Sequence, residues 1–362
     1  MSKWSDHRIC GRLRIALPII QAPMAGADSP DLAIAVSEAG GLGSLACATL
    51  SGETIRSSVE FIRSRTKNPI NLNFFCHRAP IENSVRERTW RDELSAFFAE
   101  FGVDADAEFP FVNRAPFDAS LCDLVEDLRP EVVSFHFGLP DQALLTRVKA
   151  TGAVVLSSAT TVAEARWLEV NGCDMVIAQG AEAGGHRGMF LTGDVTTQVG
   201  TFALVPQVAD AVNVPVIAAG GIADGRGVAA AMMLGADAVQ VGTAYLFCPE
   251  ARPNRFHAEA LHRAQDDNTA LTNLFSGRPA RGVVNRLMRE IGPMSAAAPD
   301  FPTAGRALAG LRARAESQGR DDFTNLWSGQ AARLAKRTTA ADLTLSLMDE
   351  AKKRLFSPGI YP

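Results

Sequence analysis

The sequence predicts an α/β protein built on a (β/α)8 barrel, with an inserted segment at the rim and a helical appendage at the C-terminus. From Pro18 onward, short β-rich runs alternate with longer helix-like runs, and eight of the short runs can be identified. The chain has 362 residues, which suits one barrel of roughly 250 residues plus an appendage. An open, doubly wound sheet is the competing architecture, but eight βα units fit a closed barrel better.

The expected strands are short apolar runs. They occupy residues 18–24, 41–46, 69–75, 131–138, 153–160, 175–180, 214–221 and 238–243. Helix-like runs lie between them, for example at residues 30–40, 140–152, 161–172 and 225–235. Three of these four runs open near Asp or Thr and all four close on Gly, which is typical of capped helices.

Two segments depart from the βα repeat. Residues 81–118 lie between the third and fourth strands and hold a charged helix-like run, Val85 to Phe101, followed by a proline-bearing stretch. We expect this insertion to lie over one rim of the barrel. After about Ala264 the repeat ends and the chain becomes rich in Arg and Ala. We therefore assign residues 1–266 to the barrel and residues 267–362 to a mainly helical appendage that packs on the barrel and its substrate side.

Charge, cysteine spacing and missing motifs exclude several classes of protein. The net charge is −4 and no basic stripe is interleaved with aromatic residues, so we expect no nucleic-acid partner. The six cysteines lie far apart without a CxxC pair, so neither a metal site nor a disulfide framework is indicated. The first residues carry scattered charges and no unbroken apolar run, and no later stretch approaches the length of a membrane span, so we expect the protein in the reducing cytoplasm. Without GxSxG, HExxH, Walker A or an early GxGxxG motif, hydrolase, zincin and Rossmann dehydrogenase functions lose support.

Polar residues interrupt the apolar pattern near the ends of several expected strands. Barrel strands are buried on both faces, so such a residue is costly unless it meets a ligand or another polar group. In residues 131–138, the alternation of side chains points Ser134 and His136 into the barrel mouth and Phe135 outward. The strands carry further amides at inward-facing or terminal positions, namely Gln21, Asn71, Asn73, Gln179 and Gln240.

These side chains would form a neutral ring at one rim. Such a ring can hydrogen-bond the edge of a planar heterocycle, as an isoalloxazine would require. The alternative for each single residue is that it satisfies a neighbouring backbone group inside the barrel. Because at least five of them converge on the same rim, we favour a binding site.

Glycine turns follow the last two expected strands. Gly220 and Gly221 end the seventh strand, and Gly242 and Thr243 end the eighth. Backbone N–H groups of these two turns form the usual phosphate site of a (β/α)8 barrel. The alternative is that each glycine only meets the steric demands of a tight turn. Two such turns on adjacent strands indicate a cofactor that carries a phosphate.

The loop after the sixth strand, residues 179–188, is long and rich in glycine and contains His186 and Arg187. An imidazole there could accept a substrate proton or, when charged, stabilise an anion; the alternative is a surface histidine without a role. Arg187 could pair with a substrate carboxylate or with Glu182, but we favour an exposed rim charge. We expect four further arginines to form a solvated basic face: Arg278, Arg281, Arg286 and Arg289. The alternative is that they contact an anionic tail of the substrate.

Together these motifs make the sequence similar to the nitronate monooxygenase family, formerly called 2-nitropropane dioxygenases, of the class I type. The matching segments are PIIQAPMAG, NLNFFCH, VVSFHFG, AQGAEAGGHRG, PVIAAGGIADGRG, GADAVQVGTAYLFCPE, SGRPARG and LWSGQAARLA. They run from residue 18 to about residue 335, which is nearly the whole chain. The most specific part is EAGGHRG together with SFHFG, since AAGGIADGRG recurs across related flavin barrels.

The resemblance implies an FMN cofactor. The ring system would meet Met24, Asn73 and Gln179, and the glycine turns with Thr243 would cradle the phosphate. The complete set of implied cofactor contacts is Met24, Asn73, Gln179, Gly184, Gly221, Gln240, Val241, Gly242 and Thr243.

The resemblance also implies a reaction. A nitronate, such as propionate 3-nitronate, passes an electron to the flavin, and O2 then completes its conversion to a carbonyl compound and nitrite without a nicotinamide. His186 matches the family's catalytic histidine, the base proposed for neutral nitroalkanes, and His136 matches a second histidine near the substrate. With a nitronate, which is already an anion, His186 would act on binding or orientation. Neither the physiological substrate nor the oligomeric state follows from the sequence.

Three alternatives stay open at this point. The nearest is an FMN-dependent NAD(P)H reductase of the enoyl-ACP reductase or quinone reductase type on the same barrel, which differs in its electron source. A phosphate-binding isomerase or lyase would keep the barrel and lack the flavin. A non-catalytic binding protein is least favoured, because a polar ring plus a histidine loop exceeds what a scaffold needs.

Overall fold

The computed structural model describes residues 8–79, 83–107 and 114–356. Parallel strands form an eight-stranded sheet in the order β1-β9-β8-β6-β5-β4-β3-β2, and a bridge between Ile20 and Leu42 joins β1 to β2. The sheet therefore closes on itself, which confirms the predicted (β/α)8 barrel. Each strand lies inside its predicted run: β1 Ile19–Gln21, β2 Gly43–Ala46, β3 Ile70–Phe75, β4 Val132–His136, β5 Val154–Ala159, β6 Met175–Gln179, β8 Val216–Ala219 and β9 Ala238–Val241.

Helices cover the outside of the barrel between successive strands. These are α2 Pro30–Glu38, α3 Gly52–Arg65, α6 Ala119–Leu128, α7 Gln142–Ala150, α8 Val162–Val170, α9 Thr201–Ala209 and α10 Gly225–Met233. Side-chain oxygens cap most of their N-termini; Ser29, for example, accepts from the Leu32 backbone N–H in α2 and Asp141 from that of Leu144 in α7. These caps satisfy amide groups that a helix start leaves without partners.

The alternation of side chains along the strands separates two hydrophobic layers. On β4, Val133 and Phe135 pack under the surrounding helices, whereas Val132 faces the barrel interior. The short helix α1 (Arg8–Leu13) closes the amino-terminal end, because Ile9 and Leu13 join that interior layer. The opposite end of the barrel, where the polar strand ends lie, is left for a binding site.

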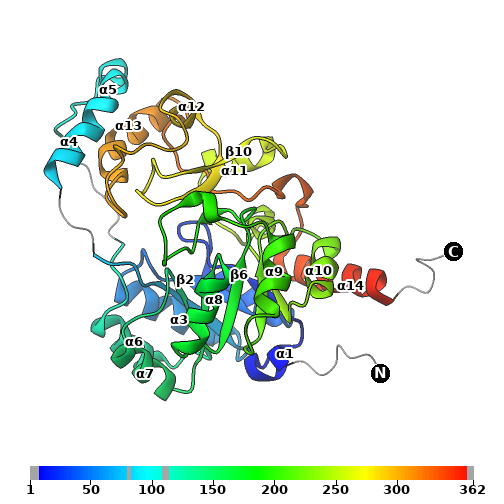
Figure 1. Cartoon of the computed structure of the whole chain (residues 1–362). Coiled ribbons are helices and arrows are strands. Elements are labelled where there is room, and N and C mark those ends of the chain that lie inside the picture. The colour runs from blue at the N-terminus through cyan, green and yellow to red at the C-terminus, as the bar shows by residue number, and fades with distance from the viewer. Residues whose placement is uncertain (1–7, 80–82, 108–113, 357–362) are drawn as a thin grey trace.

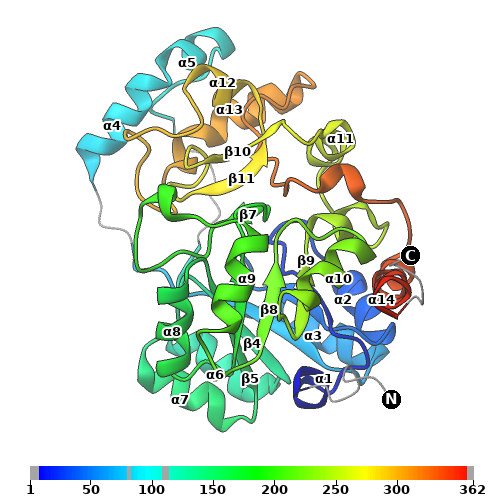
Figure 2. The ribbon, with the colours of Figure 1, turned by 45° about the vertical axis from the view of Figure 1, so that its right-hand side comes forward.

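The eighth barrel helix comes from the far end of the chain. Helix α14 (Ala340–Phe356) packs beside α10 and α2, as Figures 1 and 2 show. The buried hydroxyl of Tyr245 lies 2.7 Å from that of Thr344 on α14. The expected division at residue 266 placed this helix in the appendage, whereas the structure puts it on the barrel wall. Because a long segment separates β9 from α14, the last βα unit does not follow the regular spacing of the others along the sequence.

The insertion and most of the appendage form a single cap over one end of the barrel (Figure 1). We use "the cap" for residues 83–107 and 268–329. Its elements are α4 Ser84–Glu93, α5 Ser95–Phe101, β10 Thr269–Thr272, β11 Ala280–Val283, α12 Arg286–Glu290 and α13 Gly305–Ser317. The expected run from Val85 to Phe101 is two helices that meet at Leu94. Residues 81–82 and 108–113 of the predicted insertion, and 357–362 of the predicted appendage, lie outside the described residues.

The cap has its own hydrophobic core. Trp90 and Phe97 of the insertion pack with Leu308 and Phe323 of the appendage, and the Trp90 indole N–H donates to the Ala304 carbonyl at 3.0 Å. A three-stranded antiparallel sheet, β10-β11-β7, ties the cap to the barrel, because β7 (Gly185–His186) belongs to the loop after β6. Figure 2 shows β7 between the two bodies. The prediction of a mainly helical appendage missed this sheet.

The connections that remain are short. They comprise the helix α11 (Arg255–Arg263) and the 3-10 turns η2 Val195–Thr197, η3 Thr243–Phe247 and η4 Ala332–Leu334.

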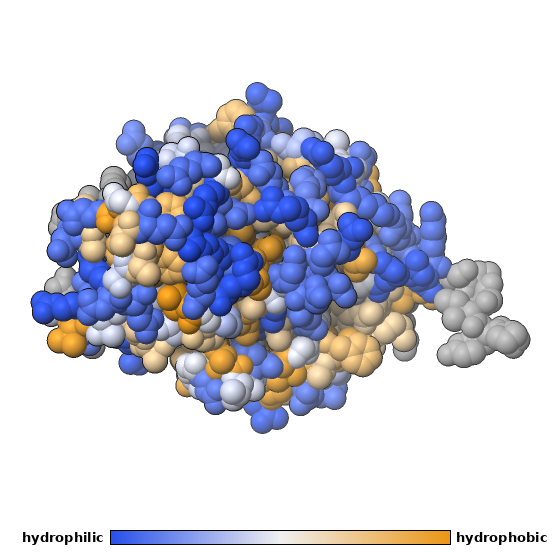
Figure 3. All heavy atoms as spheres, turned by 90° about the horizontal axis from the view of Figure 1, so that it is seen from above, coloured by the Kyte–Doolittle hydropathy of each residue, from blue (hydrophilic) through white to orange (hydrophobic). Residues whose placement is uncertain are grey.

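Hydrophilic side chains cover much of the outer face of the cap (Figure 3). None of the helices in the described part of the chain is long and apolar enough to cross a membrane. Within the same residues, no three His, Cys, Asp or Glu side chains are grouped so that they could hold a metal ion.

Candidate active site

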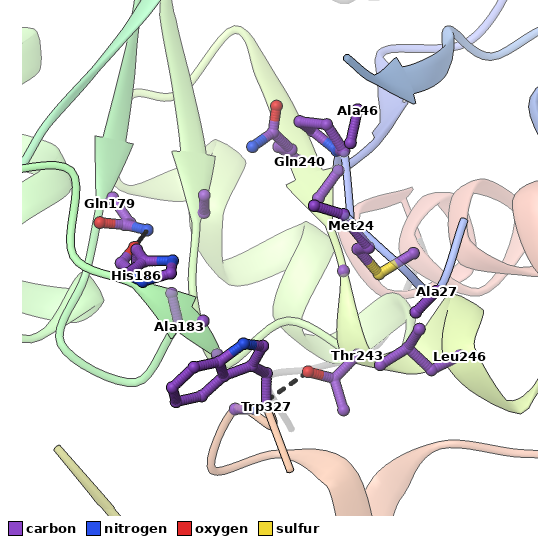
Figure 4. Close-up of a pocket in the computed structure, with 18 of the residues that line it drawn as sticks. Met24, Ala27, Ala46, Gln179, Ala183, His186, Gln240, Thr243, Leu246 and Trp327 are labelled. Carbon is purple, nitrogen blue, oxygen red and sulfur yellow. Dashed lines mark hydrogen bonds between the residues drawn. The ribbon is translucent and has the colours of Figure 1, made fainter. Parts of the chain in front are cut away.

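A cavity of about 380 Å³ lies between the carboxyl ends of the barrel strands and the cap. Loops after β1, β6, β8 and β9 form its walls, and Asn325 and Trp327 close it from the cap side. Figure 4 shows Trp327 beside Thr243, with Met24 and Gln240 across the cavity from Gln179 and His186. A cavity of this size at this end of a barrel is where a small-molecule site is expected.

The structure gathers nearly all of the predicted site residues around this one cavity. Val241 is the exception: its side chain packs into the layer under the barrel helices, and its carbonyl accepts from the Ala22 backbone N–H at 2.8 Å. The cavity is lined by His136, His186, Met24, Asn73, Gln179, Gly184, Gly221, Gln240, Gly242 and Thr243.

One end of the cavity is formed by the turns that follow β8 and β9. Within the described chain, the backbone N–H groups of Gly221, Gly242 and Thr243 donate to no carbonyl. Gly221 has a φ of +70°, in the left-handed region that glycine enters without strain. Unpartnered N–H groups at a turn are the donors that bind a phosphate. This end of the cavity can therefore hold the phosphate of a cofactor.

A carboxylate, Glu182, also lies at this end. Its two oxygens accept from the Thr201 backbone N–H at 2.8 and 3.0 Å, and one of them accepts from the Thr201 hydroxyl at 2.8 Å. Thr201 is the first residue of α9, so the negative charge sits at the positive end of that helix. The hydrogen bonds from Thr201 and the dipole of helix α9 partly neutralise the charge of Glu182, so this carboxylate repels a bound anion less strongly.

The walls beside the strand ends are polar and neutral. The Asn73 amide donates to the Ser134 hydroxyl at 2.9 Å, and the Gln240 side-chain oxygen is buried with no partner among the described residues. An unpartnered buried amide oxygen is costly, so Gln240 fits a ligand that supplies a donor. Gln21, expected in the same ring, instead bonds its neighbours Ser44 and Ala22 inside the barrel.

The loop after β6 is held rigidly in place. Gly185 and His186 form β7 and pair with Arg281 and Ala280 of the cap. The Gln179 side chain clamps the same loop, since it donates to the His186 carbonyl at 3.0 Å and accepts from the Gly188 N–H at 2.7 Å. These bonds fix the backbone from which the His186 ring projects.

Gly184 makes a close approach possible within this loop. A Cβ atom at Gly184 would lie 2.5 Å from the Gly329 nitrogen and 2.6 Å from the Ser328 carbonyl carbon. Because both contacts are with backbone, any larger residue must displace the loop or the end of the cap. Gly184 therefore brings the barrel and the cap together at the edge of the cavity.

The His186 ring is neutral and has one free nitrogen. Its Nε2 lies 2.8 Å from the Ser276 hydroxyl oxygen. That hydroxyl donates to the Arg278 carbonyl at 3.3 Å, so its oxygen accepts a hydrogen bond from Nε2–H, the tautomer in which Nδ1 is unprotonated. Burial, and next the Arg114 guanidinium, hold the pKa of His186 well below its ordinary 6.5. A neutral imidazole with an unpartnered Nδ1 can accept a proton or a hydrogen bond from a substrate.

His136 supports the loop rather than a substrate in this arrangement. Its Nε2 donates to the His186 carbonyl at 3.1 Å, and its Nδ1 accepts from the Ser158 hydroxyl at 3.1 Å. Burial lowers the pKa of His136 to about 4, against a smaller opposing effect of the bond to the His186 carbonyl. The ring is therefore neutral at pH 7, with both nitrogens engaged.

Three arginines expected at the surface are buried or partly buried. Arg187 was expected to be an exposed rim charge, which is wrong, because its side chain is completely buried. It donates to the carbonyls of Gly180 and Gln179 at 2.7 and 2.6 Å, and burial lowers its pKa to about 10. Arg281 donates to the Ala181 carbonyl, and Arg278 lies over the Phe137 ring at 4.1 Å. All three hold the rim loops in place. Arg286 instead pairs with Glu100 and Glu290 on the outside of the cap.

Sequence reasoning missed several residues that shape the cavity. Asp28 joins the loops after β1 and β2, since it accepts from the backbone N–H groups of Met24 and Ala46 at 3.1 and 2.8 Å. Burial raises the pKa of Asp28 to about 7. Ser276 and Trp327 come from the distant cap and flank His186, the Trp327 ring at 5.4 Å. The segments SGRPARG and LWSGQAARLA, which contain Ser276 and Trp327, gave a signal of similarity but no indication of position.

The chain matches known proteins over almost its full length. Residues 7–350 match the model of a protein family described as nitronate monooxygenase. A nitronate monooxygenase of Pseudomonas aeruginosa is 43% identical over 342 residues, which cover 94% of this chain and 97% of the relative. Nitroalkane oxidase from Streptomyces ansochromogenes superposes with a TM-score of 0.83 at 37% identity, covering 94% and 96% of the two chains. FabK from Thermotoga maritima gives a TM-score of 0.73 at 30% identity, covering 96% and 97%.

Proposed function

The chain belongs to the nitronate monooxygenase family, and on that premise we propose that it oxidises alkyl nitronates with FMN and O2 to a carbonyl compound and nitrite. Family membership makes the chain an oxidoreductase. The observation that carries the proposal is the pairing, in one cavity, of a turn with free N–H groups and a neutral histidine with a free nitrogen. Propionate 3-nitronate is the substrate that we propose as an example.

The residues of the cavity fit an FMN cofactor. The free N–H groups of Gly221, Gly242 and Thr243 would hold the phosphate, because side-chain-free backbone can approach the anion closely. Asn73 and Gln240 would meet the polar edge of the ring system and Met24 its apolar face. When bound, the flavin supplies electron transfer from the nitronate and then to O2. The protein supplies binding, orientation and a dry, neutral surrounding.

His186 would serve two kinds of substrate in different ways. A nitronate is already an anion, so His186 would orient it by a hydrogen bond rather than remove a proton. A neutral nitroalkane must first lose a proton from carbon, and the unprotonated Nδ1 of His186 could accept it. Ser276 and Gln179 hold the ring and its backbone in position for both.

The alternative, an FMN-dependent NAD(P)H reductase of the enoyl-ACP or quinone reductase type, has weaker support. FabK is less similar to this chain than the nitroalkane oxidase both in identity and in TM-score. Both proposals use the same barrel and the same phosphate turns, so they differ in the molecule that delivers electrons.

Steady-state turnover with two candidate substrates tests the proposal. The purified chain, reconstituted with FMN, is incubated in air with propionate 3-nitronate or ethyl nitronate, and O2 uptake and nitrite release are followed. We expect both signals in proportion to enzyme and without NADH or NADPH. If the enzyme oxidises NADPH without a nitronate and releases no nitrite from either nitronate, the proposal is refuted and the reductase function is supported.

A further inference from the structure

One cation that lines the cavity lacks a negative partner. Arg114 lines the cavity and is partly buried, yet within the described chain its guanidinium forms no salt bridge and donates no hydrogen bond. Two other partly buried arginines differ: Arg278 donates to the Met189 carbonyl and Arg312 to the Phe323 carbonyl. A partly buried guanidinium that contacts no acceptor of the described chain keeps its N–H donors available for an anion that enters the cavity.

Arg114 lies on the histidine side of the cavity. The segment that carries it is tied to the end of β3, because the Phe117 N–H donates to the Phe75 carbonyl at 2.7 Å. The Phe75 ring in turn lies 6.2 Å from the His186 ring. After burial, Arg114 is the strongest influence on the pKa of His186. The cation therefore acts on the group that would meet the nitronate.

The surroundings of Arg114 strengthen its positive field. Arg312 lowers the pKa of Arg114 by like-charge repulsion, second to the effect of burial. Beside His186, the aromatic rings of Phe75, Phe137 and Phe301 pack within 6.1 Å of one another. Such rings exclude water and weaken screening, so an anion placed there interacts strongly with the guanidinium.

We propose that Arg114 is a specificity-determining residue that binds a second anionic group, a carboxylate, on the substrate. The nitronate group would lie at His186 and the carboxylate would accept hydrogen bonds from the planar guanidinium, whose fork matches two carboxylate oxygens. This inference rests on the proposed function and extends it, since it assigns to one residue the preference for carboxylate-bearing nitronates over nitronates with an uncharged tail.

The test compares two nitronates with the same number of carbons. Propionate 3-nitronate carries the carboxylate, and 1-propyl nitronate does not. In the FMN-loaded full chain, we expect Arg114→Met to lower kcat/KM for propionate 3-nitronate by at least about tenfold, mainly through KM. The same variant should leave kcat/KM for 1-propyl nitronate within about threefold of the wild type, because uniform binding is lost only for the charged tail.

Two further variants separate a binding role from a structural one. Arg114→Lys keeps a charge but loses the planar fork, so its kcat/KM for propionate 3-nitronate should fall between those of the wild type and Arg114→Met. Arg320→Met removes an arginine of the cap that pairs with Asp322 and does not line the cavity. That control should leave the ratio of the two kcat/KM values unchanged.

A binding measurement covers the case in which a variant loses turnover. Calorimetry without O2 compares 3-nitropropionate with 1-nitropropane as ligands, and only the former should bind more weakly to Arg114→Met. Equal losses on both nitronates in Arg114→Met, or no loss on either, would overturn the assignment. If the wild type oxidises neither nitronate, the proposed function is refuted. The role of Arg114 in carboxylate binding is then tested by the calorimetric comparison alone.

Discussion

Gly221→Asp places a negative charge where the proposal puts the cofactor phosphate. A Cβ atom at Gly221 would lie 3.5 Å from Cβ and 3.7 Å from Cγ of Glu182, which are ordinary contact distances. A side chain therefore fits at this position, and its main structural cost comes from the φ of +70°. For a residue other than glycine, that conformation costs roughly 1–2 kcal/mol. This strain weakens folding with or without cofactor, so it contributes little to the loss of FMN affinity.

The charge accounts for the loss of affinity. A carboxylate about 5 Å from one phosphate charge, at an effective dielectric constant of about 20, is repelled by roughly 3 kcal/mol. A phosphate with nearly two charges raises the repulsion. We expect FMN to bind at least about 100-fold more weakly to Gly221→Asp than to the wild type.

Gly221→Ala is the matched control, because it introduces the same backbone strain without the charge. Quenching of FMN fluorescence during titration of each apoprotein measures the affinity, and thermal unfolding measures the strain. Gly221→Ala should share the loss of thermal stability and keep its FMN affinity within about tenfold of the wild type. Equal FMN affinities for Gly221→Asp and Gly221→Ala would refute the placement of the phosphate at this turn.

Four further predictions concern the histidine loop and the last helix. His186→Asn should retain FMN and lose more kcat/KM on 1-nitropropane than on ethyl nitronate, whereas equal losses would contradict the base role. Because the pKa of His186 is lowered, its neutral form persists as pH falls through 6.5, so wild-type kcat/KM for 1-nitropropane should decline only at lower pH. Gln179→Leu leaves the Gly188 N–H without its acceptor and should lower the free energy of unfolding by about 1–3 kcal/mol in denaturant titrations; an unchanged value would contradict the clamp. Tyr245→Phe removes the hydroxyl contact with Thr344 and should cost about 1 kcal/mol of stability, and a double-mutant cycle with Thr344→Val that shows no coupling would contradict the docking of α14.

The barrel could be predicted because its strands obey a local rule. Side chains alternate along a strand, so the residues of β4 reveal two faces without knowledge of any partner, and Val132 and Val133 indeed lie in different layers. The last helix obeys no such local rule. Its partner strand, β9, ends at Val241, and α14 begins at Ala340, so only tertiary packing brings the two together.

The same distinction separates the predicted from the missed parts of the site. The glycine turns and His186 can be recognised as site residues from the few residues around each of them, and they do line the cavity. Ser276, Trp327 and Arg114 reach the cavity from the cap and the segments beside it, and nothing near them in sequence indicates that position. Arg187 was misjudged because a rim position usually exposes a charge. Here the guanidinium is buried and donates to three acceptors, the Gln198 side chain and the carbonyls of Gln179 and Gly180.

Anaerobic reduction of the FMN-loaded protein tests the central claim most directly. The flavin absorbance is followed after mixing with propionate 3-nitronate and, in a separate sample, with NADH or NADPH. The account predicts rapid bleaching by the nitronate, little change with either nicotinamide, and nitrite once the nitronate-treated sample is opened to air. Bleaching by a nicotinamide alone, or a protein that takes up no flavin, would contradict it.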